Sequence, residues 1–500
     1  MKILDKSQIQ EADRQTIAMK SISSFQLMES AAKACRDWIV NRFDNNQHFS
    51  FICGTGNNGG DGLTLYRLLM EKNYPCILYE FPVGDNPTEE YLENKRKIEA
   101  DLILKLTPEA FSSISNKDII IDGLLGTGIN RPVIGELKKV IQSLNALPNT
   151  IISIDIPSGL FSEYNSNNPG DGILQANFTL SFQMPKLAFL LPEQGEKAGQ
   201  FHLLDIGLNT EFIEKVKTPY HYLTTKKANS LFKLPKKFDH KGKNGHHLLV
   251  AGSKGKMGAA ILAAKGSLRS GVGKLSILTP QSGIEVLQNS IPESMIEFNN
   301  GINCLSGYYN YNFNTISLGP GIGTSNETAQ FVFSLLSKTQ AQMVIDADAI
   351  NILANKPKWI KKLPKNTILT PHPKEFERLV GSWQNDQEKL EHLSQFCQKY
   401  HLICILKGAH TAIAFPNRTL WFNSTGNPGM AKAGSGDVLT GIIGGLLAKG
   451  YPPQVAALLG VYAHGRSGDL KLKSHSSTFL ISSDLISGLS EVWKEMQESS

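Results

Sequence analysis

The chain has 500 residues, of which 41% are hydrophobic and 19% are charged. This balance is typical of a soluble globular protein that is long enough for more than one domain. A net charge of +6 without a basic block argues against nucleic acid as a partner, and no apolar run approaches the ~20 residues that a membrane span needs. Six cysteines without metal-ligand spacing indicate free thiols in a reducing compartment, so we expect a cytoplasmic protein.

The first part of the chain alternates predicted helices and strands. Apolar residues at helical spacing predict helix over residues 7–42, and a buried strand follows at 49–53. A helix over 61–72 and a strand over 74–81 complete a βαβ unit. Two further strands, rich in β-branched residues, are predicted at 118–122 and 151–156. The expected fold is a doubly wound parallel sheet.

Three of these strands end in polar, glycine-containing loops: G-T-G-N-N-G-G-D-G from Gly54, D-G-L-L-G-T-G from Asp122 and D-I-P-S-G from Asp155. In an open parallel sheet, ligands bind beyond the carboxyl ends of the strands, so the three loops should share one crevice. Each loop alone could serve only as a helix cap or a turn. Their convergence therefore predicts a binding site more firmly than any single motif.

The first loop satisfies G-x-G-x-x-G, and Glu80 follows near the acidic position of a dinucleotide fold. That pattern alone would indicate an NAD-dependent dehydrogenase. The loop is, however, crowded with side-chain oxygens that a pyrophosphate turn does not need. Together with the other two loops, these oxygens favour a hard cation or the recognition of ribose and amide groups. The oxygens come from Asn57, Asn58, Asp61, Asp122, Asp155 and Ser158.

A boundary is predicted between residues 209 and 238, where Lys, Thr and Pro replace the apolar periodicity. The second part again alternates strands with helical patterns, which indicates a second α/β domain. The predicted domains cover residues 1–215 and 225–500. Strands are expected at 246–253, 274–278, 315–318, 343–345, 367–369 and 402–406, and helices at 438–449, 454–469 and 483–497.

A second glycine-rich loop, G-N-P-G-M-A-K-A-G-S-G-D, runs from Gly426 to Asp437 and opens into an apolar helix. Main-chain N–H groups at such a helix start can hold a phosphate, and a carboxylate beside them can accept the proton of an attacking hydroxyl. An ordinary aspartate in a first helical turn is the simpler alternative. Two phosphate-type loops on one chain suggest two active sites that serve one phosphate-bearing metabolite.

The three loop strings of the first domain closely resemble those of the NAD(P)H-hydrate epimerases. The resemblance covers about residues 1–215 and implies a Rossmann-like fold that interconverts the R and S epimers at C6 of a hydrated nicotinamide ring. It implies K⁺ held by Asn58, Asp122 and Ser158, and Asp155 as the acid or base. Lys186 matches a further position of the family without a role assigned. The implied substrate contacts are Asn57, Asn58, Gly59, Gly60, Asp61, Gly126, Thr127, Gly128, Ile129, Asn130, Arg131, Pro132 and Asp155.

The second part resembles the ribokinase-like NAD(P)H-hydrate dehydratase domains. The matching strings include G-P-G-I-G, D-A-D-A-I, T-P-H-P-K-E-F, L-K-G-A-H-T and G-N-P-G-M-A-K-A-G-S-G-D. The resemblance implies Asp437 as the catalytic base, ADP as co-substrate and Mg²⁺, for which Glu375 is a candidate ligand. The hydrated dinucleotide would contact Ala259, Gly321, His372 and Asp437, and ADP would contact Lys407, Gly408, Ala409, His410, Thr411 and Gly436.

The joint expectation is a bifunctional isomerase and lyase that repairs hydrated NADH and NADPH and forms a homo-oligomer. Two other functions stay open from the residues. A ribokinase-like vitamin kinase could use the same G-S-G-D and would release a phosphorylated product. Alternatively, one half could be a non-catalytic binding module.

Overall fold

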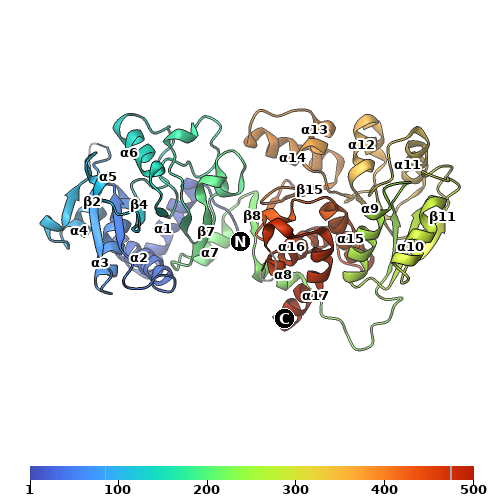
Figure 1. Cartoon of the computed structure of the whole chain (residues 1–500), viewed down its shortest axis with the longest axis horizontal. Coiled ribbons are helices and arrows are strands. Elements are labelled where there is room, and N and C mark those ends of the chain that lie inside the picture. The colour runs from blue at the N-terminus through green and yellow to red at the C-terminus, as the bar shows by residue number, and fades with distance from the viewer. Residues whose placement is uncertain (85, 473–475, 500) are drawn as a thin grey trace. The chain divides into compact units, whose positions relative to one another are not determined.

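The computed structural model describes residues 1–84, 86–472 and 476–499. The chain separates into two compact units, one of Lys2–Tyr220 and one of His221–Ser500 together with Met1 (Figure 1). Both units are α/β, as expected. Among the described residues, no helix is long and apolar enough to cross a membrane.

The first unit contains a seven-stranded sheet in the order β3-β2-β1-β4-β5-β6-β7, in which all paired strands are parallel. The order reverses between β1 and β4, which is the switch point of a doubly wound sheet. The predicted fold of this part is confirmed. The strands are β1 Phe49–Cys53, β2 Cys76–Glu80, β3 Ile103–Lys105, β4 Ile119–Gly123, β5 Thr150–Ile154, β6 Phe178–Phe182 and β7 Gln200–Leu204.

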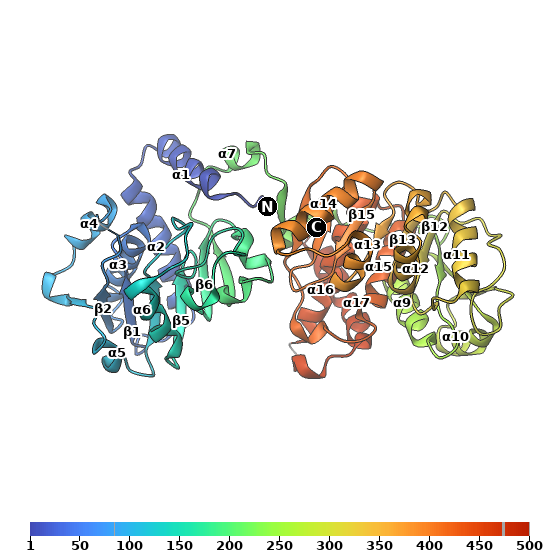
Figure 2. The same ribbon diagram turned by 90° about the horizontal axis from the view of Figure 1, so that it is seen from above.

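Helices cover both faces of this sheet. On β1, Phe51 belongs to a core with α2 and α3, whereas its neighbour Ile52 belongs to a core with α6. Helices α2, α3 and α4 lie together (Figures 1 and 2). The helices are α1 Lys6–Lys20, α2 Ser24–Val40, α3 Asn57–Met70, α4 Glu89–Lys95, α5 Ala110–Ser113, α6 Gly135–Ala146 and α7 Thr210–Lys215, with short 3-10 turns η1 Ala100–Leu102, η2 Gly170–Gly172, η3 Leu187–Leu190 and η4 Gly195–Ala198.

The region predicted as helical over residues 7–42 is helical, but the chain breaks between α1 and α2. Ser21 adopts the left-handed conformation at the end of α1, with φ of 52°. Ser23 then begins α2 with a capping box, in which its side chain and that of Gln26 each accept a hydrogen bond from the other's main-chain N–H. The helical region therefore consists of two helices.

The second unit contains a ten-stranded sheet in the order β11-β10-β9-β12-β13-β14-β15-β16-β17-β8. Strands β9 to β15 pair in parallel, and β15, β16 and β17 pair antiparallel. These strands are β8 Tyr220–Leu223, β9 His246–Val250, β10 Lys274–Thr279, β11 Met295–Phe298, β12 Thr315–Leu318, β13 Gln342–Ile345, β14 Ile368–Leu369, β15 Ile403–Leu406, β16 Ala412–Ala414 and β17 Leu420–Asn423.

Helix α15 is the centre of this unit and lies between α9 and α16 (Figures 1 and 2). Glycines allow the close approach: a Cβ on Gly441 would lie 1.9 Å from the carbonyl oxygen of Ala263. The helices are α8 Thr225–Leu231, α9 Met257–Arg269, α10 Ile284–Ser290, α11 Asn326–Lys338, α12 Ala347–Asn355, α13 Pro373–Val380, α14 Asp386–Tyr400, α15 Ser435–Ala448, α16 Pro453–Lys471 and α17 Ser482–Glu498, with 3-10 turns η5 Gln281–Gly283, η6 Pro357–Lys362, η7 Pro428–Met430 and η8 Ser477–Phe479.

Candidate active sites

In the first unit, the three polar loops follow β1, β4 and β5, which are adjacent parallel strands. Their carboxyl ends therefore meet at one edge of the sheet, as predicted. The first loop differs in detail, because α3 begins at Asn57 and not at Asp61. Gly56 precedes the helix and provides no side-chain cap. The first turn of α3 thus presents its N–H groups and the positive end of the helix at this edge.

The three predicted cation ligands are brought together and are buried. The hydroxyl of Ser158 donates to Asp122 Oδ1 at 2.5 Å, and Asn58 Nδ2 donates to the carbonyl oxygen of Leu125 at 2.8 Å. That same carbonyl lies 3.3 Å from the Ser158 hydroxyl. Among the described residues, no lysine or arginine forms an ion pair with Asp122. Buried oxygens without a cationic side chain suit a bound cation.

Asp155 follows β5 in a strained conformation, with φ of 61°. Its Oδ1 accepts hydrogen bonds from Lys186 Nζ at 2.7 Å and from the N–H of Phe182 at 3.1 Å. The Lys186 side chain is only 2% exposed, against 16% for Asp155. The buried ammonium of Lys186 therefore fixes the direction of the Asp155 carboxylate, which still reaches solvent. Sequence analysis did not identify this role of Lys186.

Two further carboxyl groups, Asp61 and Asp13, interact electrostatically with Asp155. Burial, followed by the charges of Asp155 and Asp13, raises the pKa of Asp61 well above its usual value. Burial and the charge of Asp155 raise the pKa of Asp13 to about 6, although Lys186 partly opposes this shift. Carboxyl groups with different affinities for a proton are suited to acid–base chemistry. Asp13, on α1, carries no recognisable signal in the sequence.

The predicted substrate segments differ in exposure. In the second loop, Gly128, Asn130, Arg131 and Pro132 are exposed, and Gly126, Thr127 and Ile129 are half-buried. In the first loop, Asn57 is exposed and Asp61 half-buried, whereas Asn58, Gly59 and Gly60 are buried. Gly59 lies against the carbonyl of Gly54, so this glycine shapes the turn.

In the second unit, Asp437 lies in the first turn of α15. Gly434 precedes the helix with φ of 88°, a left-handed conformation that favours glycine. No side chain caps this helix start. The N–H of Ser435 donates to the carbonyl of Lys432 at 3.3 Å, so it is partly used within the loop. The N–H groups of Gly436 and Asp437 follow it in the first turn, where an anion can bind.

Lys407 connects this helix start to a buried acidic cluster. Its Nζ lies 3.2 Å from Asp346 Oδ1 and 4.0 Å from Glu375 Oε2. The hydroxyl of Thr440, one turn after Asp437, donates to Asp346 Oδ2 at 2.7 Å. Burial lowers the pKa of Lys407, but the charges of Asp346 and Glu375 outweigh it and the net shift is upward. Sequence analysis assigned no role to Asp346 or Thr440.

Asp437 itself has a strongly shifted pKa. Burial raises it to about 7, with the negative charge of Asp346 adding to the shift and the positive charge of Lys407 opposing it. A carboxylate with a pKa near neutrality is well matched to general-base catalysis, because it can take up a proton at physiological pH.

The other residues predicted for this site lie on different elements. Ala259 in α9 and Gly321 face each other, because a Cβ on Gly321 would lie 3.1 Å from that of Ala259. His372 is the N-cap of α13, and its Nδ1 accepts the N–H of Glu375 at 3.2 Å. The predicted nucleotide segment of Lys407, Gly408, Ala409, His410 and Thr411 connects β15 to β16, and Gly408 and Ala409 are exposed.

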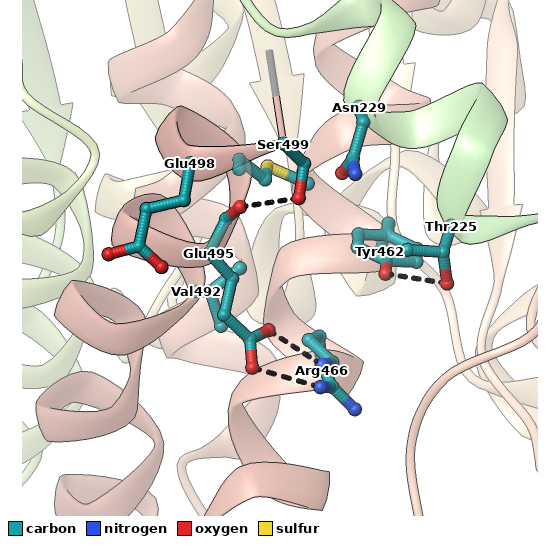
Figure 3. Close-up of a pocket in the computed structure, with 9 residues that line it drawn as sticks. Thr225, Asn229, Tyr462, Arg466, Val492, Glu495, Glu498 and Ser499 are labelled. Atoms are coloured by element: carbon teal, nitrogen blue, oxygen red, sulfur yellow. Dashed lines mark hydrogen bonds and ion pairs between the residues drawn. The ribbon is translucent and has the colours of Figure 1, made fainter.

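A pocket of about 290 Å³ lies elsewhere in the second unit, between α8, α16 and α17 (Figure 3). Arg466 and Glu495 form a two-fold ion pair on its wall, with distances of 2.9 and 3.0 Å. None of the predicted site residues lines this pocket. The described residues also contain no group of three or more His, Cys, Asp or Glu side chains arranged to hold a metal.

Comparison with known proteins covers both units. Residues 247–489 match the family described as NAD(P)H-hydrate dehydratase, and residues 24–188 match the family described as YjeF-related protein N-terminus. The bifunctional NAD(P)H-hydrate repair enzyme Nnr of Moorella thermoacetica is 31% identical over 526 aligned residues, which cover 100% of this chain and 98% of the relative. Its counterpart in Escherichia coli is 28% identical, with 97% of this chain and 92% of the relative covered.

Among solved structures, the ADP/ATP-dependent NAD(P)H-hydrate dehydratase of Bacillus subtilis, co-crystallised with ATP/Mg²⁺, is 32% identical. The match covers 55% of this chain and 98% of that one, with a TM-score of 0.49. The Moorella relative, in contrast, is matched along the whole chain. The protein therefore belongs to the family of bifunctional NAD(P)H-hydrate repair enzymes, with an epimerase domain followed by a dehydratase domain.

Proposed function

We propose that the first unit equilibrates the R and S epimers of hydrated NADH and NADPH, and that the second unit dehydrates the S epimer at the expense of ADP. The products are NADH or NADPH, AMP and phosphate. The observation that carries this proposal is Asp437, a carboxylate with a raised pKa at the uncapped start of α15 beside Lys407. A base, an anion-binding helix start and a cation are the groups that phosphoryl transfer to an alcohol needs.

In the dehydration, Asp437 accepts the proton of the C6 hydroxyl. The hydroxyl oxygen forms a bond to the β-phosphorus of ADP, and the bond from that phosphorus to the bridging oxygen breaks, which releases AMP with the electron pair. The C6–O bond then breaks with help from the lone pair of the ring nitrogen, and phosphate leaves with the bonding electrons. Loss of a proton from C5 completes the C5–C6 double bond. The N–H groups at the start of α15 and Lys407 stabilise negative charge on the transferring group.

In the epimerisation, Asp155 is the proposed acid or base at C6, and Lys186 directs its carboxylate. Opening and closing of the ring or of the C–O bond needs a proton shuttle near this carbon. Asp61, whose pKa is raised, is suited to carry a proton on the same side of the sheet. The half-buried and exposed residues of segment 126–132 would hold the rest of the substrate.

The oxygens of Asn58, Asp122 and Ser158, with the carbonyl of Leu125, would hold K⁺, which would supply a fixed positive charge at this edge of the sheet. Asp122→Asn removes a charge from this cluster without changing its size. We expect epimerisation by the variant to lose most of its response to K⁺, measured as the rate of R-to-S conversion between 0 and 100 mM KCl at constant ionic strength. An unchanged response would refute the assignment.

In the second unit, Mg²⁺ would accompany the nucleotide and supply charge neutralisation of its phosphates. Glu375 is the carboxylate proposed as its ligand: it is buried, and Mg²⁺ there would replace the weak interaction of Glu375 Oε2 with Lys407 Nζ, 4.0 Å away. The cytoplasmic location and the homo-oligomeric state remain predictions. Sedimentation analysis of the full chain would test the second of these.

The direct test is incubation of the protein with hydrated NADH, ADP, Mg²⁺ and K⁺, followed by the absorbance of the reduced nicotinamide. Asp437→Ala should fold and lose dehydration by about 10²–10⁴-fold, the usual contribution of a general base. The melting temperature serves as the folding control. Dehydration by this variant at a rate near that of the wild type would remove Asp437 as the base.

A further inference from the structure

Helix α16 contacts both ends of the loop that leads into α15, which we call loop 426–435. The carboxylate of Asp469 accepts the N–H of Gly426 on Oδ2 and the side-chain amide of Asn427 on Oδ1, each at 3.0 Å. At the other end of the loop, Ser435 Oγ lies 3.2 Å from Nε2 of His464. One helix therefore bonds to the first and the last residues of the loop.

The spacing of the α16 residues explains how one helix reaches both ends. His464, Gly465, Gly468 and Asp469 fall at i, i+1, i+4 and i+5, which places them on one face of the helix. The two glycines leave room for the loop. A Cβ on Gly468 would lie 2.4 Å from the sulfur of Met430, so a larger residue would displace the loop.

The side chain of Asn427 links Asp469 to the interior of loop 426–435. Its side-chain oxygen accepts the N–H of Gly429 at 3.1 Å, while its amide nitrogen donates to Asp469. The 3-10 turn η7 therefore begins from a side chain that Asp469 holds in place. Residues 431–433 remain exposed between the two ends of the loop.

We infer that His464 and Asp469 are positioning residues for phosphoryl transfer, which hold loop 426–435 so that the start of α15 faces the phosphoryl group. The inference rests on the proposed function of the second unit. Neither residue is assigned a contact with the reacting atoms. Both act through the loop, so their loss should lower kcat for dehydration more than it changes KM for ADP or for the hydrate.

The test uses the full chain, and its melting temperature reports whether each variant is folded. Asp469→Asn leaves one acceptor for two donors and should lower kcat for dehydration by about 10–100-fold, the range found when a supporting contact shifts reacting groups. His464→Leu should have a smaller effect in the same direction. His464→Gln, whose amide can still bond to Ser435, should recover most of the loss.

A reciprocal exchange makes the test more specific. In Asp469→Asn combined with Asn427→Asp, the donor and acceptor change places, while the total charge and the number of bonds are kept. This double variant should regain kcat relative to Asp469→Asn alone. Arg466→Gln is the matched control, because it breaks the ion pair of α16 with Glu495 away from the loop (Figure 3) and should leave kcat within about threefold.

The outcomes separate the two hypotheses. A wild-type chain that does not regenerate reduced nicotinamide from the hydrate would refute the proposed function. A wild-type chain that is active, with Asp469→Asn equally active, would refute only the positioning role. Equal losses of dehydration in Asp469→Asn, the double variant and Arg466→Gln would also overturn it, because the loss would then reflect the stability of α16.

Discussion

Asp437 lies between neighbours of opposite charge, and this arrangement sets the pH at which it can act. Asp346 raises its pKa and Lys407 lowers it, on top of the larger effect of burial. A base must be deprotonated to accept a proton, so kcat/KM for dehydration should fall as the pH drops below about 7.

Two substitutions should move the pH at which kcat/KM falls, the acidic limb of the pH profile, in opposite directions. Asp346→Asn removes a negative charge, lowers the pKa of Asp437 and should shift the limb to lower pH. Lys407→Met removes a positive charge, raises that pKa and should shift the limb to higher pH. Profiles of kcat/KM between pH 5 and 9 measure both shifts. Lys432→Met serves as the control, because Lys432 is an exposed lysine of loop 426–435. Shifts in the same direction would contradict the electrostatic account.

At the scale of elements, the start of α3 depends on a contact that only glycine permits. A Cβ on Gly59 would lie 1.8 Å from the carbonyl oxygen of Gly54, which is main chain and cannot turn aside. At Gly56, three residues earlier, no heavy atom lies within 4 Å of the position that a Cβ would take. The turn between β1 and α3 therefore tolerates a side chain at one position and not at the other.

Gly59→Ala should destabilise the first unit by about 1–3 kcal/mol, the usual cost of overpacking, and should lower epimerisation strongly. Gly56→Ala should cost less than about 1 kcal/mol, since only the helix N-cap preference changes. Thermal unfolding and the rate of R-to-S conversion measure the two effects. Similar losses in both variants would show that the close contact does not govern this turn.

For the whole molecule, the two proposed catalytic aspartates belong to different compact units, Asp155 to the first and Asp437 to the second. A mixture of epimers should therefore reveal the two activities separately. The second unit can use the S epimer without the first unit, whereas the R epimer must first be converted to the S epimer.

With a mixture of epimers, the Asp155→Asn variant should form reduced nicotinamide in two phases. The fast phase comes from the S epimer, and the slow phase is limited by spontaneous conversion of the R epimer. The Asp437→Ala variant should recover reduced nicotinamide about 10²–10⁴-fold more slowly than the wild type, yet should still interconvert the epimers, as chromatography would show. Mixing the two variants should restore a single fast phase through free substrate. A single fast phase in Asp155→Asn alone would show that this residue is dispensable.

The sequence predicts strand positions where the residues are β-branched or form a continuous apolar run. The β-branched runs at β4 and β5, and the buried strands β9 and β12, were placed within a few residues. Strands β3, β6, β7, β8, β11, β16 and β17 were not predicted. Several of these lie toward the edges of the sheets, where burial is partial and the apolar pattern is therefore weak.

The amino-acid sequence by itself determined the two α/β folds and the loops at the strand ends, and it predicts Asp437 as a candidate base, because glycine spacing and strand–loop–helix order are local properties. Only the tertiary structure decided that Lys186 holds Asp155, that Asp346 and Lys407 surround Asp437, and that α16 bonds to loop 426–435. The hydrogen-bonded pairs among these residues are 29 to 61 residues apart along the chain. Parallel sheets and packed helices join distant segments, and no local pattern records which side chains will then meet.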